Sequence, residues 1–267
     1  MYTREGANQR SKINYKMQIL RTKFKGEIVA EFVMPKKMTN KVMIICGGMP
    51  TYPAKEKYSE LFEFYTSKGF SVFVPRYRGS WESGGQMFAK SPHLDIKDII
   101  DELPNGFKDL WNGTSFKIED PEIYIIGSSF GGPAGLLNSK DPRVKKVICF
   151  CPVLDWRTMD DTVEPISLVS ELIKDAFGNG YRIAKNGWSK IEKGDFYNPA
   201  SETDKINGSK CLIIQAKDDN IVSVKAVPAF IEKTHSKLWL VAKGGHLGMS
   251  LMKKRFAKKC FEFLRSK

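Results

Sequence analysis

One short stretch of the sequence, from Ile123 to Gly132, constrains the fold of this chain more than any other. It begins with a run of apolar residues, ends abruptly in small ones and continues into a segment compatible with a helix. Such a stretch predicts a buried strand, a sharp turn and a helix start. The predicted strand covers residues 122–126. Pro133 falls in the first turn of the predicted helix, where its missing N–H group costs no hydrogen bond.

The residues at this turn, Gly127 to Gly131, match the pattern G-x-S-x-G. In this pattern a strained turn holds the hydroxyl group of the middle serine clear of the sheet, and glycines on either side avoid steric collisions. Ser129 is therefore a candidate nucleophile. The pattern is short enough to occur by chance, so the alternative is a glycine-rich turn without chemistry.

The composition is that of an ordinary globular protein. The chain has 267 residues, 42% of them hydrophobic, which is enough for a sizeable core. No run of about 18 apolar residues occurs, and the polar N-terminus lacks a signal-peptide core, so we expect no membrane association and a cytoplasmic location. Most of the five cysteines lie in or beside apolar runs, which indicates free thiols in a reducing compartment.

The formal net charge of +13 raises the question of nucleic-acid binding, because clustered basic residues attract phosphates. However, lysines alternate with acids in nearly every segment, and the densest basic runs are short. We therefore expect no nucleic-acid partner. Cys149-Phe150-Cys151 has neither the spacing nor the second pair of a zinc site, and only three histidines are present. We expect neither a metal ion nor a cofactor.

The rest of the chain alternates between apolar runs and helix-like segments. Polar and apolar residues alternate in residues 16–20 and 26–33 around Lys25-Gly26, which predicts an antiparallel hairpin. Further strands are predicted at 41–46, 70–74, 144–150, 211–216 and 238–241, and helices at 58–68, 93–111 and 252–264, with Pro104 as a candidate break. This order predicts an α/β fold, with a mostly parallel sheet and helices on both faces.

The alternation lapses between residues 153 and 209, where only residues 167–177 look helical. Because this insertion follows the carboxyl end of a strand, we expect a cap at about residues 155–205, within a single domain of residues 1–267. The alternative is a surface excursion with a minor core of its own. The insertion is rich in aromatic residues that could form an apolar substrate pocket: Trp156, Phe177, Tyr181, Trp188 and Tyr197.

Two loops are also predicted to lie at the carboxyl edge of the sheet. One follows residues 41–46 and contains Met49. The other, residues 75–85, contains Tyr77 and is too long and too aromatic to be a mere connector. We expect Met49, Tyr77, Trp156 and Trp188 to contact the substrate.

A serine nucleophile needs a base to take its proton and an acid to orient that base. His246 is the candidate base, because it lies between glycines after the predicted strand at 238–241. His93, before a predicted helix, is interpreted as a capping or surface residue, and His235 lies in a polar turn. The acid should precede the histidine in the chain. Asp218 and Asp219, after the strand at 211–216, meet this requirement.

Together these residues resemble the α/β-hydrolase family, and the resemblance runs from about Val42 to His246. Family members commonly carry G-x-x-D-x-x-V around the acid. Ala216, Asp219 and Val222 align with it, with alanine in place of the glycine. The resemblance therefore implies Asp219 as the acid. Asp155 is the alternative, because some relatives place the acid after an earlier strand.

The family also has a His-Gly-x pattern after its third strand, whose last residue helps bind the oxyanion together with the residue after the nucleophile. Cys46-Gly47-Gly48 stands in that place. The resemblance thus implies the N–H groups of Gly48 and Phe130 as the oxyanion hole. Cys46 replaces the usual histidine.

A closer resemblance is to the catalytic domain of the prolyl oligopeptidase and acylaminoacyl peptidase group, which has a similar loop at Tyr77-Arg78-Gly79-Ser80. Those peptidases typically carry a propeller domain, and the roughly 40 residues before the first core strand are too few for one. Compact bacterial esterases, including feruloyl-esterase-like enzymes, are therefore the better match.

The resemblance implies a serine hydrolase that acts through an acyl-enzyme intermediate on small to medium esters. The alternatives are an amidase similar to aminopeptidases or acylaminoacyl peptidases, and a non-catalytic binding protein of the same fold. A small-molecule ester or acyl compound is the expected partner. The sequence does not specify an oligomeric state.

Overall fold

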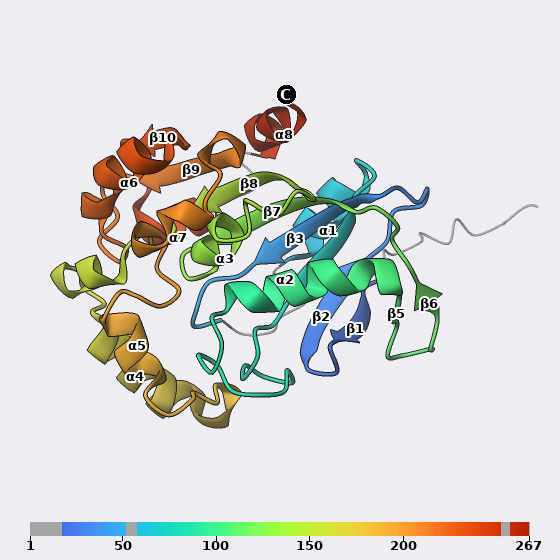
Figure 1. Cartoon of the computed structure of the whole chain (residues 1–267), viewed down its shortest axis with the longest axis horizontal. Helices are drawn as coiled ribbons and strands as arrows, with labels where there is room; N and C mark the ends of the chain where they lie inside the picture. Colours follow the sequence, from blue (N-terminus) through green and yellow to red (C-terminus); the bar gives the residue numbers. More distant parts are fainter. Residues whose placement is uncertain (1–17, 52–57, 252–256, 267) are drawn as a thin grey trace, which may run out of the picture.

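The protein is built on an eight-stranded sheet (Figure 1), seen in a computed structural model that describes residues 18–51, 58–251 and 257–266. Its strands are β1 (Leu20–Phe24), β2 (Ile28–Val33), β3 (Lys41–Cys46), β4 (Ser71–Pro75), β7 (Glu122–Ser128), β8 (Val144–Phe150), β9 (Cys211–Ala216) and β10 (Lys237–Val241). The order across the sheet is β1-β2-β4-β3-β7-β8-β9-β10. β2 pairs antiparallel with β1 and β4, and the other neighbouring pairs are parallel. The predicted fold class, a mostly parallel α/β sheet, is confirmed.

Helices cover both faces of the sheet (Figure 1). One face packs against α2 (His93–Glu102), α3 (Gly131–Leu136) and α6 (Val227–Thr234), and the other against α1 (Ser59–Thr66), α7 (Gly245–Leu251) and α8 (Ala257–Arg265). Neighbouring strand residues point to opposite faces, so Ile125 joins the first core and Ile126 the second. Two buried faces explain why the strands are continuous apolar runs. None of the helices in the described part of the chain is long and apolar enough to cross a bilayer.

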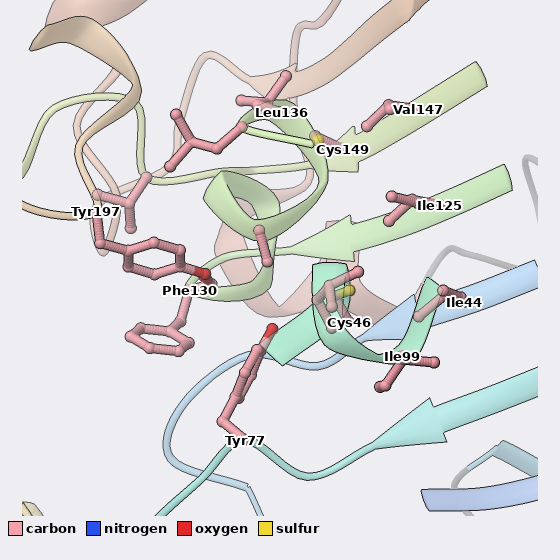
Figure 2. Close-up of a cluster of buried hydrophobic side chains, with 14 of the residues drawn as sticks. Ile44, Cys46, Tyr77, Ile99, Ile125, Phe130, Leu136, Val147, Cys149 and Tyr197 are labelled. Carbon is pink, nitrogen blue, oxygen red and sulfur yellow. The ribbon is translucent and has the colours of Figure 1, made fainter. Parts of the chain in front are cut away.

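The central strand β7 places the turn at residues 127–131 in the middle of the sheet, because it pairs with β3 on one side and β8 on the other. In Figure 2, Ile44, Ile125 and Val147 from these three strands point into the same core. Beyond the strand ends the rings of Tyr77, Phe130 and Tyr197 gather together (Figure 2). This aromatic cluster lies directly below the turn that carries Ser129.

The first strand lies further along the chain than predicted. The prediction placed it at residues 16–20, of which residues 16 and 17 lie outside the described residues, whereas β1 runs from Leu20 to Phe24. The turn after it is tight, because Glu27 N–H donates to Phe24 O over 2.9 Å and both Lys25 and Gly26 have positive φ. A strand that pairs with β2 through such a turn must continue up to residue 24.

The predicted helix over residues 93–111 is too long. α2 ends at Glu102 and is followed by a 3₁₀ turn that contains Pro104. Gly106 then has a φ of 97°, a value that favours glycine. The chain continues into a small hairpin of β5 (Phe107–Lys108) and β6 (Ser115–Phe116), which packs its phenylalanines against the core. The last predicted helix is confirmed for α8, and residues 252–256 lie outside the described residues.

His93 is neither a capping nor a surface residue, as the sequence had suggested. It is the first residue of α2 and is buried, with Nδ1 2.8 Å from the hydroxyl of Ser91. Burial lowers the pKa of this imidazole to about 4, so it is neutral at pH 7. The five cysteines are all buried and free.

The inserted segment, residues 155–205, adds helices but no strand to the sheet. Its main elements are α4 (Ile166–Leu172), a π-helical turn η4 (Ile173–Phe177) and α5 (Gly187–Glu192). In Figure 1, α4 and α5 lie beyond the end of the sheet toward which the strand arrows point. The loop after β4 holds this segment, because Trp81 N–H donates to Gly180 O and Arg182 N–H to Gly79 O, both over 2.7 Å.

Candidate active site

Ser129, the candidate nucleophile, lies in the turn between β7 and α3. It has a φ of 52°, in the left-handed region that residues with side chains rarely adopt. The neighbouring glycines are required by close packing. A Cβ atom on Gly127 would lie 2.4 Å from Gly131 O, and one on Gly131 would lie 2.2 Å from Cys46 O. The G-x-S-x-G pattern therefore describes a turn without room for side chains, and its strain is typical of functional sites.

Backbone hydrogen bonds hold Ser129 in this conformation. Its N–H donates to Phe150 O, at the end of β8, over 2.9 Å, and its carbonyl accepts from Gly132 N–H over 3.0 Å. The ends of two neighbouring parallel strands and the start of α3 thus fix the peptide unit that carries the hydroxyl group.

A hydrogen-bonded acid and base lie close to this turn. Asp219 follows β9, His246 lies at the start of α7, and Nδ1 of His246 is 2.9 Å from Oδ2 of Asp219. Both residues are buried. The Sγ atom of Cys151 lies within 4.8 Å of ligand atoms of both. Cys151 directly follows Phe150, whose carbonyl binds Ser129, so all three predicted catalytic residues lie at one edge of the sheet.

The surroundings of Asp219 keep it ionised. Burial alone would raise the pKa of this carboxyl, but hydrogen bonds from His246 and from the backbone N–H of Val222 hold it below its usual range. Val222 and Ile221 donate to Oδ1 over 2.9 and 3.0 Å, and Gln215 donates to Oδ2 over 3.1 Å. An ionised Asp219 favours the His246 tautomer with its proton on Nδ1, which leaves Nε2 as the basic nitrogen.

The two alternative acids make other contacts. Asp218 accepts hydrogen bonds from the backbone N–H groups of the two glycines before His246, over 3.0 and 2.8 Å. These bonds lower its pKa and fasten the loop that leads to the histidine. Asp155 instead forms an ion pair with Arg157, at 2.7 Å. The anchoring by Asp218 was missed by the sequence reasoning, because a side chain that binds a distant loop leaves no local pattern.

Gly48 and Phe130, the predicted oxyanion donors, flank Ser129. A Cβ atom on Gly48 would lie 3.3 Å from the Cβ atom and 3.8 Å from the Oγ atom of Ser129. Phe130 is the next residue in the chain and precedes α3. Within the part of the chain that the structure describes, neither backbone N–H donates a hydrogen bond to a protein acceptor. Two available N–H groups beside a serine hydroxyl are suited to stabilise a negatively charged oxygen.

A largely apolar cavity of about 410 Å³ opens beside Ser129. Three predicted substrate contacts line it: Met49 from the loop after β3, and Trp156 and Trp188 from the inserted segment. Ile221 and Val222, which bind the Asp219 carboxylate through their backbone, complete one wall. The same space is therefore bounded by the nucleophile turn, the acid turn and the inserted segment.

Tyr77, the fourth predicted contact, does not line this cavity. It is buried, its ring packs edge-on against Phe130 at 5.3 Å, and it lines a neighbouring cavity that also contacts Gly48 and Met49. Burial raises the pKa of its phenol well above the usual value. Tyr77 supports the residue after the nucleophile from below.

The other inserted aromatic residues follow the alternative interpretation, in which they form a core. Tyr197 is fully buried and donates its hydroxyl hydrogen to Phe130 O over 2.7 Å. Tyr181 accepts from Thr51 N–H over 2.9 Å and packs on Phe177. Two of the five aromatic residues thus line the cavity beside Ser129, and three stabilise the segment or tie it to the sheet.

Among the described residues, the group of side chains closest to a metal site is Cys151, Asp219 and His246. Burial keeps the pKa of the Cys151 thiol far above its usual value, so the thiolate that a metal ion needs does not form readily. The Asp219 and His246 atoms are also occupied by their mutual hydrogen bond. This group fits an acid–base pair better than a metal centre.

Solved structures with similar folds come from hydrolases. An esterase of Pyrococcus furiosus matches with a TM-score of 0.64 and 18% identity, over 93% of this chain and 90% of that one. The acylaminoacyl peptidase of Pyrococcus horikoshii matches with a TM-score of 0.63 and 17% identity, over 94% of this chain and 42% of that one. Est1E from Butyrivibrio proteoclasticus matches with a TM-score of 0.59 and 16% identity, over 93% and 99%. No protein-family model and no curated protein matches the sequence. The chain has the α/β-hydrolase fold.

Proposed function

We propose that this protein is a serine hydrolase that cleaves carboxylic esters, with Ser129 as the nucleophile, His246 as the base and Asp219 as the acid. The observation that carries the proposal is the 2.9 Å hydrogen bond between His246 and the ionised Asp219, next to a serine in a strained turn. Esterases and a peptidase among the proteins of similar fold support the reaction class.

In the proposed reaction, the hydroxyl oxygen of Ser129 attacks the ester carbonyl carbon, and Nε2 of His246 accepts the hydroxyl proton. The carbonyl oxygen becomes an oxyanion that the N–H groups of Gly48 and Phe130 stabilise. Collapse of this intermediate breaks the bond to the alcohol, which leaves with the proton from His246. Water then attacks the acyl-enzyme by the same steps in reverse order, and Ser129 is released.

The proposed substrates are small to medium esters. The cavity beside Ser129 is lined largely by apolar and aromatic side chains and is the size of a small ligand site. An amide needs stronger protonation of its leaving group and more extended positioning of the backbone on both sides of the bond. Amide hydrolysis is the second candidate, supported by the likeness to the acylaminoacyl peptidase.

The test is a comparison of kcat/KM for short acyl and aryl esters with kcat/KM for aminoacyl and acylaminoacyl arylamides. We expect the esters to be the better substrates. Arylamides that are cleaved as fast as esters or faster would contradict the esterase proposal and favour the peptidase alternative. The Ser129→Ala variant is the control for hydrolysis by contaminating enzymes.

A further inference from the structure

One carboxylate faces the cavity beside Ser129, among side chains that are otherwise apolar. Of the twelve described residues that line this cavity, only Ser129 and Glu164 are neither aliphatic nor aromatic. Glu164 belongs to the inserted segment and is half-buried. A charged group in an apolar cavity is costly unless it has a partner, so its presence needs an explanation.

The backbone around Glu164 is fixed by hydrogen bonds on both sides. Val163 N–H donates to Asn220 O over 3.0 Å, which ties the segment to the residue after Asp219. The N–H of Glu164 itself donates to the hydroxyl of Thr162 over 3.3 Å, and that hydroxyl donates to Met159 O over 2.6 Å. The carboxylate thus extends from a positioned backbone next to the acid turn.

Within the described residues, Glu164 forms no ion pair and its carboxylate accepts no hydrogen bond. This contrasts with Asp155 and Glu202 of the same inserted segment, which pair with Arg157 and Lys205. In a chain with a formal net charge of +13, a carboxylate that faces a ligand cavity without a basic neighbour is an exception.

The aromatic wall of the cavity suits the same kind of ligand as the carboxylate. Trp156 and Trp188 both line it, and the indole N–H of Trp156 is held by Tyr197 O at 2.8 Å, which fixes the ring. Tryptophan faces attract ammonium groups through cation–π interactions, and apolar walls accept the methylene or methyl groups attached to them. An anion would be repelled by Glu164, and a neutral ligand would leave the carboxylate unpaired.

We propose that Glu164 selects esters that carry a positively charged ammonium group in the part that enters this cavity. The inference rests on the proposed function, because it names the class of substrate for the same site. It also gives the amidase alternative a physical basis, since aminoacyl substrates carry such a group on the acyl side.

Glu164 also comes shortly before α4, where a negative charge stabilises a helix. This structural role predicts a change in stability when the charge is removed and no change in the choice between substrates. A ratio of two substrates, measured for each variant separately, distinguishes the two roles.

The experiment uses two pairs of isosteric esters that differ only in a positive charge. For the acyl side, the 4-nitrophenyl ester of 4-(trimethylammonio)butanoate is compared with that of 5,5-dimethylhexanoate. For the alcohol side, acetylcholine is compared with 3,3-dimethylbutyl acetate. The ratio of kcat/KM, cationic over neutral, is measured for the wild type, for Glu164→Gln and for Glu171→Gln. Glu171 is an exposed glutamate on α4 that does not line the cavity, so it is the matched control.

We expect a ratio of about fivefold or more in one pair for the wild type and for Glu171→Gln, and a ratio near one for Glu164→Gln. The preference should weaken as salt is added. Wild-type ratios of about one or below in both pairs would overturn the inference, as would a preference that survives Glu164→Gln.

A binding measurement keeps this inference separate from the proposed function. Calorimetric titration of the Ser129→Ala protein with butyltrimethylammonium should give binding that Glu164→Gln weakens and Glu171→Gln leaves intact. Loss of ester hydrolysis together with intact, Glu164-dependent binding would contradict the esterase and retain the cation site. Ester hydrolysis without such binding, and without a cationic preference, would do the opposite.

Discussion

The two halves of the candidate site are held in place by different forces. The nucleophile turn, residues 127–132, is held by steric fit, because Gly127 and Gly131 approach other backbone atoms too closely for any side chain. The acid–histidine half is held by hydrogen bonds between charged and polar groups. Asp219 accepts from His246 and two backbone N–H groups, and Asp218 accepts from the loop before the histidine.

This difference teaches that the two halves should fail in different ways. A tightly packed turn is sensitive to added volume and insensitive to pH. A hydrogen-bonded carboxylate with a lowered pKa is sensitive to loss of charge and to acid. The following predictions are ordered from the largest expected effect to the smallest.

The largest effect should show that the two halves act as one catalytic unit. Ser129→Ala and His246→Ala should each lower kcat/KM for an activated ester by about 10³-fold or more, because attack requires both the hydroxyl and its base. The double variant should lose little more than either single variant. Losses that multiply would mean that the two residues act independently and would contradict the shared role.

The next effect tests which acid supports the histidine. Asp219→Asn should lower kcat/KM by about 10²-fold or more without unfolding the protein, because the amide favours the wrong imidazole tautomer. Asp155→Asn should have a small effect, and Asp218→Asn a milder one than Asp219→Asn, since it only loosens the loop before His246. Steady-state kinetics of the three variants provide the measurement. A larger loss for Asp155→Asn than for Asp219→Asn would reverse the assignment.

Added volume should damage the nucleophile turn and not the acid–histidine half. Gly131→Ala should reduce the free energy of unfolding by at least about 2 kcal/mol, because its Cβ would lie 2.2 Å from Cys46 O. Gly248→Ala in α7, where a Cβ meets nothing within 4 Å, is the matched control and should be neutral or stabilising. Denaturant unfolding of both variants is the measurement. Equal stability of the two would contradict the packing argument.

Acid should affect the halves in the opposite way. The pKa of Asp219 is lower in the folded protein than its value of about 3.9 in an unfolded chain, so its contribution to stability is complete above that value. It is lost as the pH falls through the folded pKa, below about pH 4. The melting temperature of Asp219→Asn should therefore decline less steeply than that of the wild type between pH 5 and 3. The Gly131→Ala curve should run parallel to that of the wild type, and a parallel Asp219→Asn curve would remove the charge from the account.

The central part of the fold could be predicted from the sequence because its signals are local. Three strands, 41–46, 144–150 and 211–216, have the predicted bounds, since an apolar run buried on both faces needs no partner to be recognised. The helix at 93–111 was predicted too long, because the fate of Phe107 depends on a hydrophobic cluster formed by strands far away in the chain.

The candidate site was predictable only where motifs are short and sequential. Ser129 and His246 could be identified by the glycines around them, but the hydrogen bonds of Asp218 and the division of the inserted aromatic residues depend on contacts between distant segments. Glu164 carried no signal at all, since a glutamate before a helix is ordinary. Its significance comes from the apolar side chains that the fold places around it.

The most direct test of the central claim is covalent labelling of Ser129. A fluorophosphonate probe needs a serine whose hydroxyl is activated by a base, so it should modify the wild type at a single site. Peptide mapping by mass spectrometry should place the adduct on Ser129, and Ser129→Ala should not react. Labelling that persists unchanged in Ser129→Ala, or a wild type that remains unlabelled while folded, would contradict the assignment of Ser129 as the nucleophile.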